Sequence, residues 1–297
     1  MKKLTFQDVL ILLVIVSGWA FNVIAMKFGL MELPPLLMLL LRFIIVAAVL
    51  VPFHPLPRQQ MPLLCLLAFT FGFVHFALLL FGMQYTDAGS AAVLVQMGTP
   101  MAMVLAAVWL REKLAMRQII GVGAAVAGVM VLSGSPSLLS WHGPALLLVS
   151  ASGWACTNIL IKRSPPIAPL AMTGWLSLFA IPWVLLSSLL TEHHQLHSLL
   201  SAGWRGWLGV LYSAFGSSLL AYSLWYWLLK KYPVNQILPW SLLSPALAML
   251  MGVAILGEKL DEGKLWGAGL IVSGIFIAVA HPWLLRHNLW RKGKTSL

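Results

Sequence analysis

Apolar residues fill ten long stretches of the chain, and short connections with charged residues, proline or glycine separate them. Most stretches approach the ~20 residues that a helix needs to cross the apolar core of a bilayer. Each is expected to be a helix, because an open strand in lipid would leave backbone groups unpaired. The segments are 8–28, 34–52, 61–83, 88–109, 116–132, 143–161, 169–190, 207–229, 234–255 and 264–281. The pattern predicts an all-α integral membrane protein with ten transmembrane helices.

Composition supports this class of protein. Hydrophobic residues make up 60% of the 297 residues and charged residues 9%, against about 25% charged residues in ordinary globular proteins. These values exclude a water-soluble enzyme, a disordered chain and a secreted disulfide scaffold. Cys65 and Cys156 both lie in apolar runs without a Cys-x-x-Cys motif, so neither a zinc site nor a disulfide framework is expected.

The loop charges predict the orientation in the membrane. The formal net charge is +11, from 19 Lys and Arg against 8 Asp and Glu. If the N-terminus is cytoplasmic, fourteen basic residues fall on the cytoplasmic side and four on the opposite side, while Arg42 lies within the second segment. Because cytoplasmic loops are enriched in Lys and Arg, both termini are predicted to be cytoplasmic. The positive charge then reflects topology and requires no nucleic-acid partner.

Two parts of the chain repeat each other. Residues 17–27 recur as 152–162, with six of eleven positions identical. A second match pairs 110–114 with 256–260 and continues into the following segment, where three glycines recur at the same spacing. The first helix has an internal copy, so it is interpreted as a retained span rather than a cleaved signal peptide.

The repeat contains five segments, which is an odd number, so the second copy must enter the membrane from the opposite side. The chain is therefore predicted to form two inverted five-helix repeats, residues 1–135 and 143–285, followed by a basic cytoplasmic tail, 286–297. Inverted repeats are typical of secondary transporters, which bind substrate near the bilayer midplane between the two halves.

The order of these features resembles the EamA-type transporters of the drug/metabolite transporter superfamily over essentially the whole chain. The resemblance rests on residues 18–22 and 153–155, on Arg42-Phe43, and on fourth and ninth segments that contain proline and run into a Glu-Lys-Leu turn and a glycine-rich helix. Within that superfamily the chain resembles bacterial amino-acid and metabolite exporters. The resemblance implies a bacterial inner-membrane location and alternating access without ATP. It leaves the substrate open, and also whether the protein is a monomer or a homodimer.

Three polar residues lie at a similar depth within their segments. Arg42 could bind a substrate carboxylate through its forked guanidinium, or it could bond helix-end carbonyls or extend toward the membrane surface. His75 could accept a proton and couple transport to a proton gradient, or it could be a neutral packing residue. Gln96 could line a cavity or bond a neighbouring helix.

Aromatic and amide side chains supply further candidates for a substrate cavity. They are Trp19, Asn22, Trp154, Thr157, Asn158 and Tyr222. Trp225 and Tyr226 accompany Tyr222, but they lie near a helix end, where an interfacial aromatic belt is their expected place.

Pro100 and Pro245 are expected to lie in the middle of the fourth and ninth helices. Each would free a backbone carbonyl and act as a hinge or a pocket wall. The glycines of the fifth and tenth segments are expected to allow close helix packing.

Motifs of catalysis are missing from the sequence, which contains neither H-E-x-x-H nor G-x-S-x-G. Residues 293–295 resemble the end of a Walker A motif, but its first glycine is missing. We therefore expect no catalytic residue, no metal site, no cofactor and no enzyme activity. The sequence predicts a secondary-active or facilitative transporter that exports amino acids or related small metabolites, with the lipid bilayer and a small-molecule substrate as partners. The alternatives are a drug-efflux or uptake carrier of the same fold, then an intramembrane enzyme or a signalling receptor.

Overall fold

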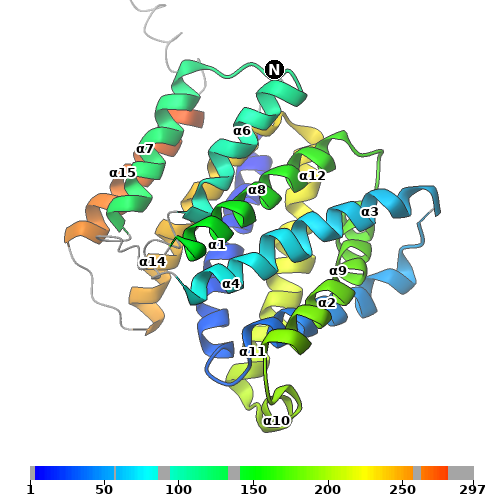
Figure 1. Ribbon diagram of the computed structural model, residues 1–297. Coiled ribbons are helices and arrows are strands. Elements are labelled where there is room, and N and C mark those ends of the chain that lie inside the picture. Colours follow the sequence, from blue (N-terminus) through cyan, green and yellow to red (C-terminus); the bar gives the residue numbers. More distant parts are fainter. Residues whose placement is uncertain (1–3, 57, 86–93, 133–140, 257–261, 280–297) are drawn as a thin grey trace, which may run out of the picture.

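The computed structural model describes residues 4–56, 58–85, 94–132, 141–256 and 262–279, and in these ranges every regular element is a helix (Figure 1). The 88–93 part of the fourth predicted segment, the 286–297 tail and most of the 133–143 connection lie outside the described residues. The first half contains α1 (Phe6–Gly29), α2 (Pro35–Leu50), η1 (Val51–Phe53), η2 (Arg58–Gln60), α3 (Met61–Ala68), η3 (Phe69–Ala77), α4 (Leu78–Gln84), α6 (Gly98–Trp109) and α7 (Met116–Leu132). The second half contains α8 (His142–Arg163), α9 (Pro169–Thr191), α10 (Gln195–Ser201), α11 (Trp204–Tyr212), η4 (Ser213–Tyr222), α12 (Ser223–Lys231), α13 (Val234–Ile237), η5 (Leu238–Leu242), α14 (Leu243–Leu256) and α15 (Glu262–Val279).

Seven helical runs within the described ranges are long and apolar enough to cross a membrane. They are Phe6–Gly29, Pro35–Phe53, Arg58–Met83, His142–Arg163, Pro169–Thr191, Trp204–Lys231 and Val234–Ile255. Three shorter apolar helices, Leu94–Trp109, Met116–Val131 and Leu265–Ala278, fall at the fourth, fifth and tenth predicted segments. Large apolar side chains such as Ile120, Val272 and Phe276 are exposed on the outer surface, which lipid tails would cover. The chain is thus a multi-pass membrane protein. Ten crossings stay a prediction, because three of the ten segments are represented by shorter helices.

Helices α7 and α15 lie side by side at one edge of the molecule (Figure 1). A methyl group added to Gly128 would lie 2.7 Å from the carbonyl oxygen of Gly267, and one added to Gly274 would lie 2.6 Å from that of Gly121. In the sequence repeat, Gly121 corresponds to Gly267 and Gly128 to Gly274, so each contact maps onto the other when the copies are exchanged. The two equivalent helices are therefore antiparallel, as an inverted repeat requires.

Helices α2 and α9 form a second pair of equivalent segments in contact. The first turn of α2 donates backbone N–H groups of Leu36 and Leu37 to the Glu192 carboxylate, which follows the end of α9. Near the other end of the pair, Gly174 in α9 packs on Leu50 of α2. This pair is also antiparallel, so the contacts at two separate interfaces agree with an inverted relation between the halves.

The third and eighth segments are continuous spans whose centres are π-helical, in η3 and η4. π-Helices are rare and occur frequently at functional sites. The two interruptions occupy equivalent places in the two halves, where η3 packs on α8 and η4 packs on α1. The sequence pattern predicted uninterrupted helices here.

The two prolines lie near the middle of the apolar runs Leu94–Trp109 and Val234–Ile255, as expected, and each is in the first turn of the α-helix that completes its run. Pro100 is the third residue of α6, and a turn at Met97 precedes that helix. Pro245 is the third residue of α14, which follows the 3-10 turn η5. Proline has no N–H to donate to the preceding turn, so the regular α-helix begins two residues before each proline and the chain before that point is wound differently. The Thr99 and Ser241 hydroxyls, 3.0 Å apart, connect these two regions.

Candidate functional site

Arg42 lies on the inner face of α2 and is only 2% exposed. Its Nε donates a hydrogen bond to Ser218 Oγ of η4 at 2.6 Å. The guanidinium carbon lies 4.8 Å from the centroid of the Phe76 ring in η3 and 5.8 Å from that of Tyr222 in η4. The side chain therefore extends inward between the two π-helical segments, and not toward the membrane surface or a helix end. Its Nη2 is buried without a hydrogen-bond partner among the described residues.

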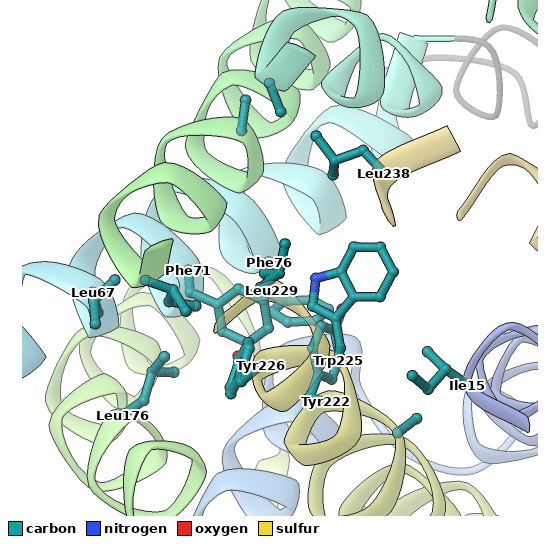
Figure 2. Packing of buried hydrophobic residues seen from close by; sticks show 14 of the residues in the cluster. Ile15, Leu67, Phe71, Phe76, Leu176, Tyr222, Trp225, Tyr226, Leu229 and Leu238 are labelled. Carbon is teal, nitrogen blue, oxygen red and sulfur yellow. The ribbon is translucent and has the colours of Figure 1, made fainter. Parts of the chain in front are cut away.

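Aromatic side chains surround this guanidinium. The ring centroids of Trp19 and Tyr222 are 4.9 Å apart, and Trp19 lies 5.0 Å from Trp225. Figure 2 shows Phe71, Phe76, Tyr222, Trp225 and Tyr226 close together inside the helix bundle. Trp225 and Tyr226 are 0% and 3% exposed, so the expectation that they belong to an interfacial belt is wrong. They point inward because α12 presents this face to α8, α9 and α1.

Two buried asparagines, one from each half, bond side chains near this cluster. Asn158 of α8 accepts a hydrogen bond from the Trp225 indole at 2.8 Å and donates one to the carbonyl of Trp154. Asn22 of α1 accepts a hydrogen bond from the Ser213 hydroxyl of η4 at 2.8 Å. Both amides are buried. The Asn22 amide links α1 of the first half to η4 of the second half, whereas the Asn158 amide fixes the Trp225 indole within the second half.

His75 and Thr157 lie at the contact between η3 and α8. His75 Nδ1 is 3.2 Å from the carbonyl oxygen of Ser150, and the Ser150 hydroxyl donates back to the carbonyl of His75 at 2.7 Å. Thr157 donates a hydrogen bond to Thr70 at 2.8 Å. These contacts are those of helix packing. The centroid of the His75 ring also lies 4.7 Å from that of the Phe76 ring, so His75 adjoins the aromatic ring that contacts the Arg42 guanidinium.

Of the remaining candidates, Gln96 precedes α6, Pro100 lies in α6 and Pro245 lies in α14. Gln96 Nε2 is buried without a partner among the described residues, as is the indole N–H of Trp19. Pro100 lines an apolar groove of about 270 Å³ between α6 and α7, and no contact in the described structure places Pro245 beside Arg42.

A small cavity of about 20 Å³ adjoins Arg42. This volume has room for about one water molecule, so the structure shows the site in a closed conformation. The cavity is lined by Met26, Pro35, Met38, Leu39, Arg42, Phe76, Leu79, Leu80 and Ser213. Sequence reasoning identified Arg42 but missed Phe76, Ser213 and Ser218. The serines had a usable signal, since Ser217-Ser218 is a polar pair within an apolar run, whereas Phe76 had none.

Contacts between the halves close the bundle at both ends. At the end where α1 begins, Asp8 forms an ion pair with Lys231 at 2.7 Å and accepts a hydrogen bond from the Tyr232 hydroxyl. At the opposite end, the Glu32 carboxylate accepts hydrogen bonds from the backbone N–H groups of Gly203 and Gly206 at 2.9 and 2.6 Å. Carboxylates at helix N-termini are favourable because they pair with N–H groups that have no partner in the helix.

Both halves of the chain match a known protein family. Residues 6–134 and 141–280 each match the EamA-like transporter family. A protein of Salmonella typhimurium named "Probable amino-acid metabolite efflux pump" is 34% identical over 283 residues, covering 92% of this chain and 95% of the relative. The protein of the same name from Escherichia coli K12 is 31% identical, with the same coverage. A solved crystal structure with 18% identity aligns with a TM-score of 0.75, covering 95% of this chain and 98% of that one, which shows a shared fold. The family and the names of these relatives indicate a transporter rather than an enzyme. This chain belongs to the EamA-like transporter family of the drug/metabolite transporter superfamily.

Proposed function

We propose that this transporter moves amino acids or related small metabolites out of the cytoplasm by alternating access, with Arg42 at the substrate site. The observation that carries the proposal is the Arg42 guanidinium, buried between η3 and η4 with an unpartnered Nη2. A buried cation with an unused donor is costly and is satisfied by an anionic group such as a carboxylate. The relatives named as amino-acid metabolite efflux pumps support this substrate class.

Alternating access is supported by where the closing contacts lie. The Asp8–Lys231 pair joins α1 to α12 across the halves, and the Glu192 carboxylate joins the end of α9 to the start of α2. Release of one set while the other holds would open the cavity to one side of the membrane at a time. The proposed repeats are residues 1–135 and 143–285. The proposed location is the bacterial inner membrane with both termini cytoplasmic, supported by the loop charges, and the protein would act as a monomer or homodimer.

The test is a counterflow assay in proteoliposomes. Purified protein is reconstituted, the vesicles are preloaded with one unlabelled amino acid or related small metabolite at a time, and uptake of the same compound in labelled form is followed. Arg42→Ala removes the charged fork and is expected to lower transport at least about a hundredfold, because truncation of one partner of a buried charge pair costs about 3 kcal/mol. Arg42→Lys keeps the positive charge but loses the forked guanidinium. Its transport rate is expected to lie between those of the wild-type and Arg42→Ala proteins.

Arg205→Ala is the matched control, because Arg205 is an exposed arginine at the start of α11. It is expected to transport at the wild-type rate. Equal counterflow by the Arg42→Ala and Arg205→Ala proteins, reconstituted in equal amounts, would refute the substrate role of Arg42. Drug efflux and uptake remain the competing functions, and a labelled cationic drug in the same vesicles tests the first of them.

A further inference from the structure

The carboxylates of the described structure are bonded near the ends of the spans. Asp8 pairs with Lys231, and Glu32, Glu112 and Glu192 each accept backbone hydrogen bonds from the first turn or the N-terminal flank of another helix. Glu262 is exposed at the start of α15. None of these five groups lines the cavity beside Arg42. The described part of the site thus holds a positive charge and no negative one.

The walls of the cavity are apolar. Met26, Met38, Leu39, Leu79 and Leu80 contribute hydrocarbon and thioether surface. Methionine side chains are flexible enough to make room for a ligand, which the closed cavity of about 20 Å³ requires. A ligand with an apolar tail is suited to these walls.

Among the described residues, no carboxylate lines this site to pair with an ammonium group. Apart from Arg42, the polar residue of the lining is Ser213, whose hydroxyl already donates to Asn22. The faces of Phe76 and Tyr222 could attract a cation, but the Arg42 guanidinium already lies against them. Burial of an unpaired ammonium is strongly unfavourable. Repulsion from the neighbouring guanidinium would add to that cost.

We propose that the Arg42 site selects a monoanion that combines a carboxylate with an apolar tail and has no free ammonium group, in preference to a zwitterionic amino acid. The chemical class is that of 2-oxo acids and N-acylated amino acids with apolar side chains. This inference rests on the proposed function, because it takes the Arg42 cavity as the substrate site. It narrows "amino acids or related metabolites" to the deaminated or N-blocked members.

Three compounds that share one branched alkyl tail test the proposal. They are 4-methyl-2-oxopentanoate, which is an anion, leucine, which is a zwitterion, and 3-methylbutylamine, which is a cation. Binding is measured on the detergent-purified protein as thermal stabilisation over a concentration series. Transport is measured as counterflow in proteoliposomes at neutral pH, with protein-free vesicles as the control for passive leakage.

The oxo acid is expected to bind with a half-saturating concentration at least about tenfold below that of leucine, and the amine is expected to give no stabilisation. Arg42→Gln should abolish the stabilisation by the oxo acid, whereas Arg205→Gln should preserve it. Should Arg42→Gln fail to fold, the comparison of the three ligands on the wild-type protein still decides.

Each other outcome has a defined meaning. Leucine binding as tightly as the oxo acid, or binding of the amine, overturns the charge selection and leaves the transporter proposal in place. Failure of all three compounds to bind also overturns it. Binding of the oxo acid without counterflow contradicts the proposed function while supporting the selectivity of the site.

Discussion

The contact between α7 and α15 leaves no room for a methyl group at Gly274. A Cβ added there would lie 2.6 Å from both Ala125 N and the carbonyl oxygen of Gly121, where ordinary contact begins near 3.4 Å. Both partners are backbone atoms, so no side-chain rotation relieves the overlap and the helices must separate locally by about 0.8 Å. A gap of this size forfeits a quarter to a half of the dispersion energy of the affected contacts. Overpacking of this kind costs about 1–3 kcal/mol.

Gly269→Ala on the same helix is the matched control, because an added Cβ there has nothing within 4 Å. It is expected to be neutral or slightly stabilising, since alanine favours helix over glycine by about 1 kcal/mol. Thermal unfolding is followed by intrinsic fluorescence in detergent at one heating rate. At roughly 2–4 °C per kcal/mol, the overpacking cost of about 1–3 kcal/mol should make Gly274→Ala unfold about 2–12 °C below Gly269→Ala. Unfolding of both proteins at the same temperature would refute the tight α7–α15 contact.

Two further predictions concern coupling and orientation. His75 makes packing contacts with Ser150, so His75→Gln should retain transport with its dependence on the pH gradient unchanged; loss of that dependence in an otherwise active variant would assign proton coupling to His75. Single cysteines placed at exposed His197 in the 191–206 connection, in a background without Cys65 and Cys156, should react with impermeant thiol reagents added to intact cells. Labelling only after the cells are opened would contradict the cytoplasmic orientation of the termini.

The framework of the fold could be predicted from the sequence, because charged connections and repeated residues can be recognised along the chain without knowledge of the tertiary contacts. Polar connections bounded the apolar segments, and the residues shared by the two copies indicated an inverted arrangement. Gly121 and Gly274 were expected at a close helix contact, and they are. Arg42 was identified because a formal charge within an apolar segment is costly.

The packing around Arg42 could not be predicted, and the reason is physical. In a membrane, the side chains that face lipid are as apolar as those that face the protein interior, so hydrophobic periodicity does not separate the two. Phe76 and Trp225 therefore looked like any other aromatic residues of their segments. The π-helical centres η3 and η4 form i→i+5 hydrogen bonds and so change which residues of each span face inward. No signal in the composition marked these segments.

The Arg42 site is asymmetric, unlike the helix contacts around it. The framework contacts recur in both halves, but Arg42 has no charged counterpart, since its equivalent lies near Ser177, which bonds the carbonyl of Thr173 in its own helix. Because the two halves are similar, an exchange of their conformations changes the free energy of these helix contacts little. A ligand shifts such an equilibrium only by the difference in its affinity for the two conformations. The unpartnered Nη2 of Arg42 is a buried donor whose burial costs about 1–3 kcal/mol, and a bound anion removes that cost wherever it can reach the guanidinium. In the closed conformation the cavity admits about one water molecule, so the anion gains this stabilisation only in a state that opens the cavity, which would make ligand binding itself the step that favours opening.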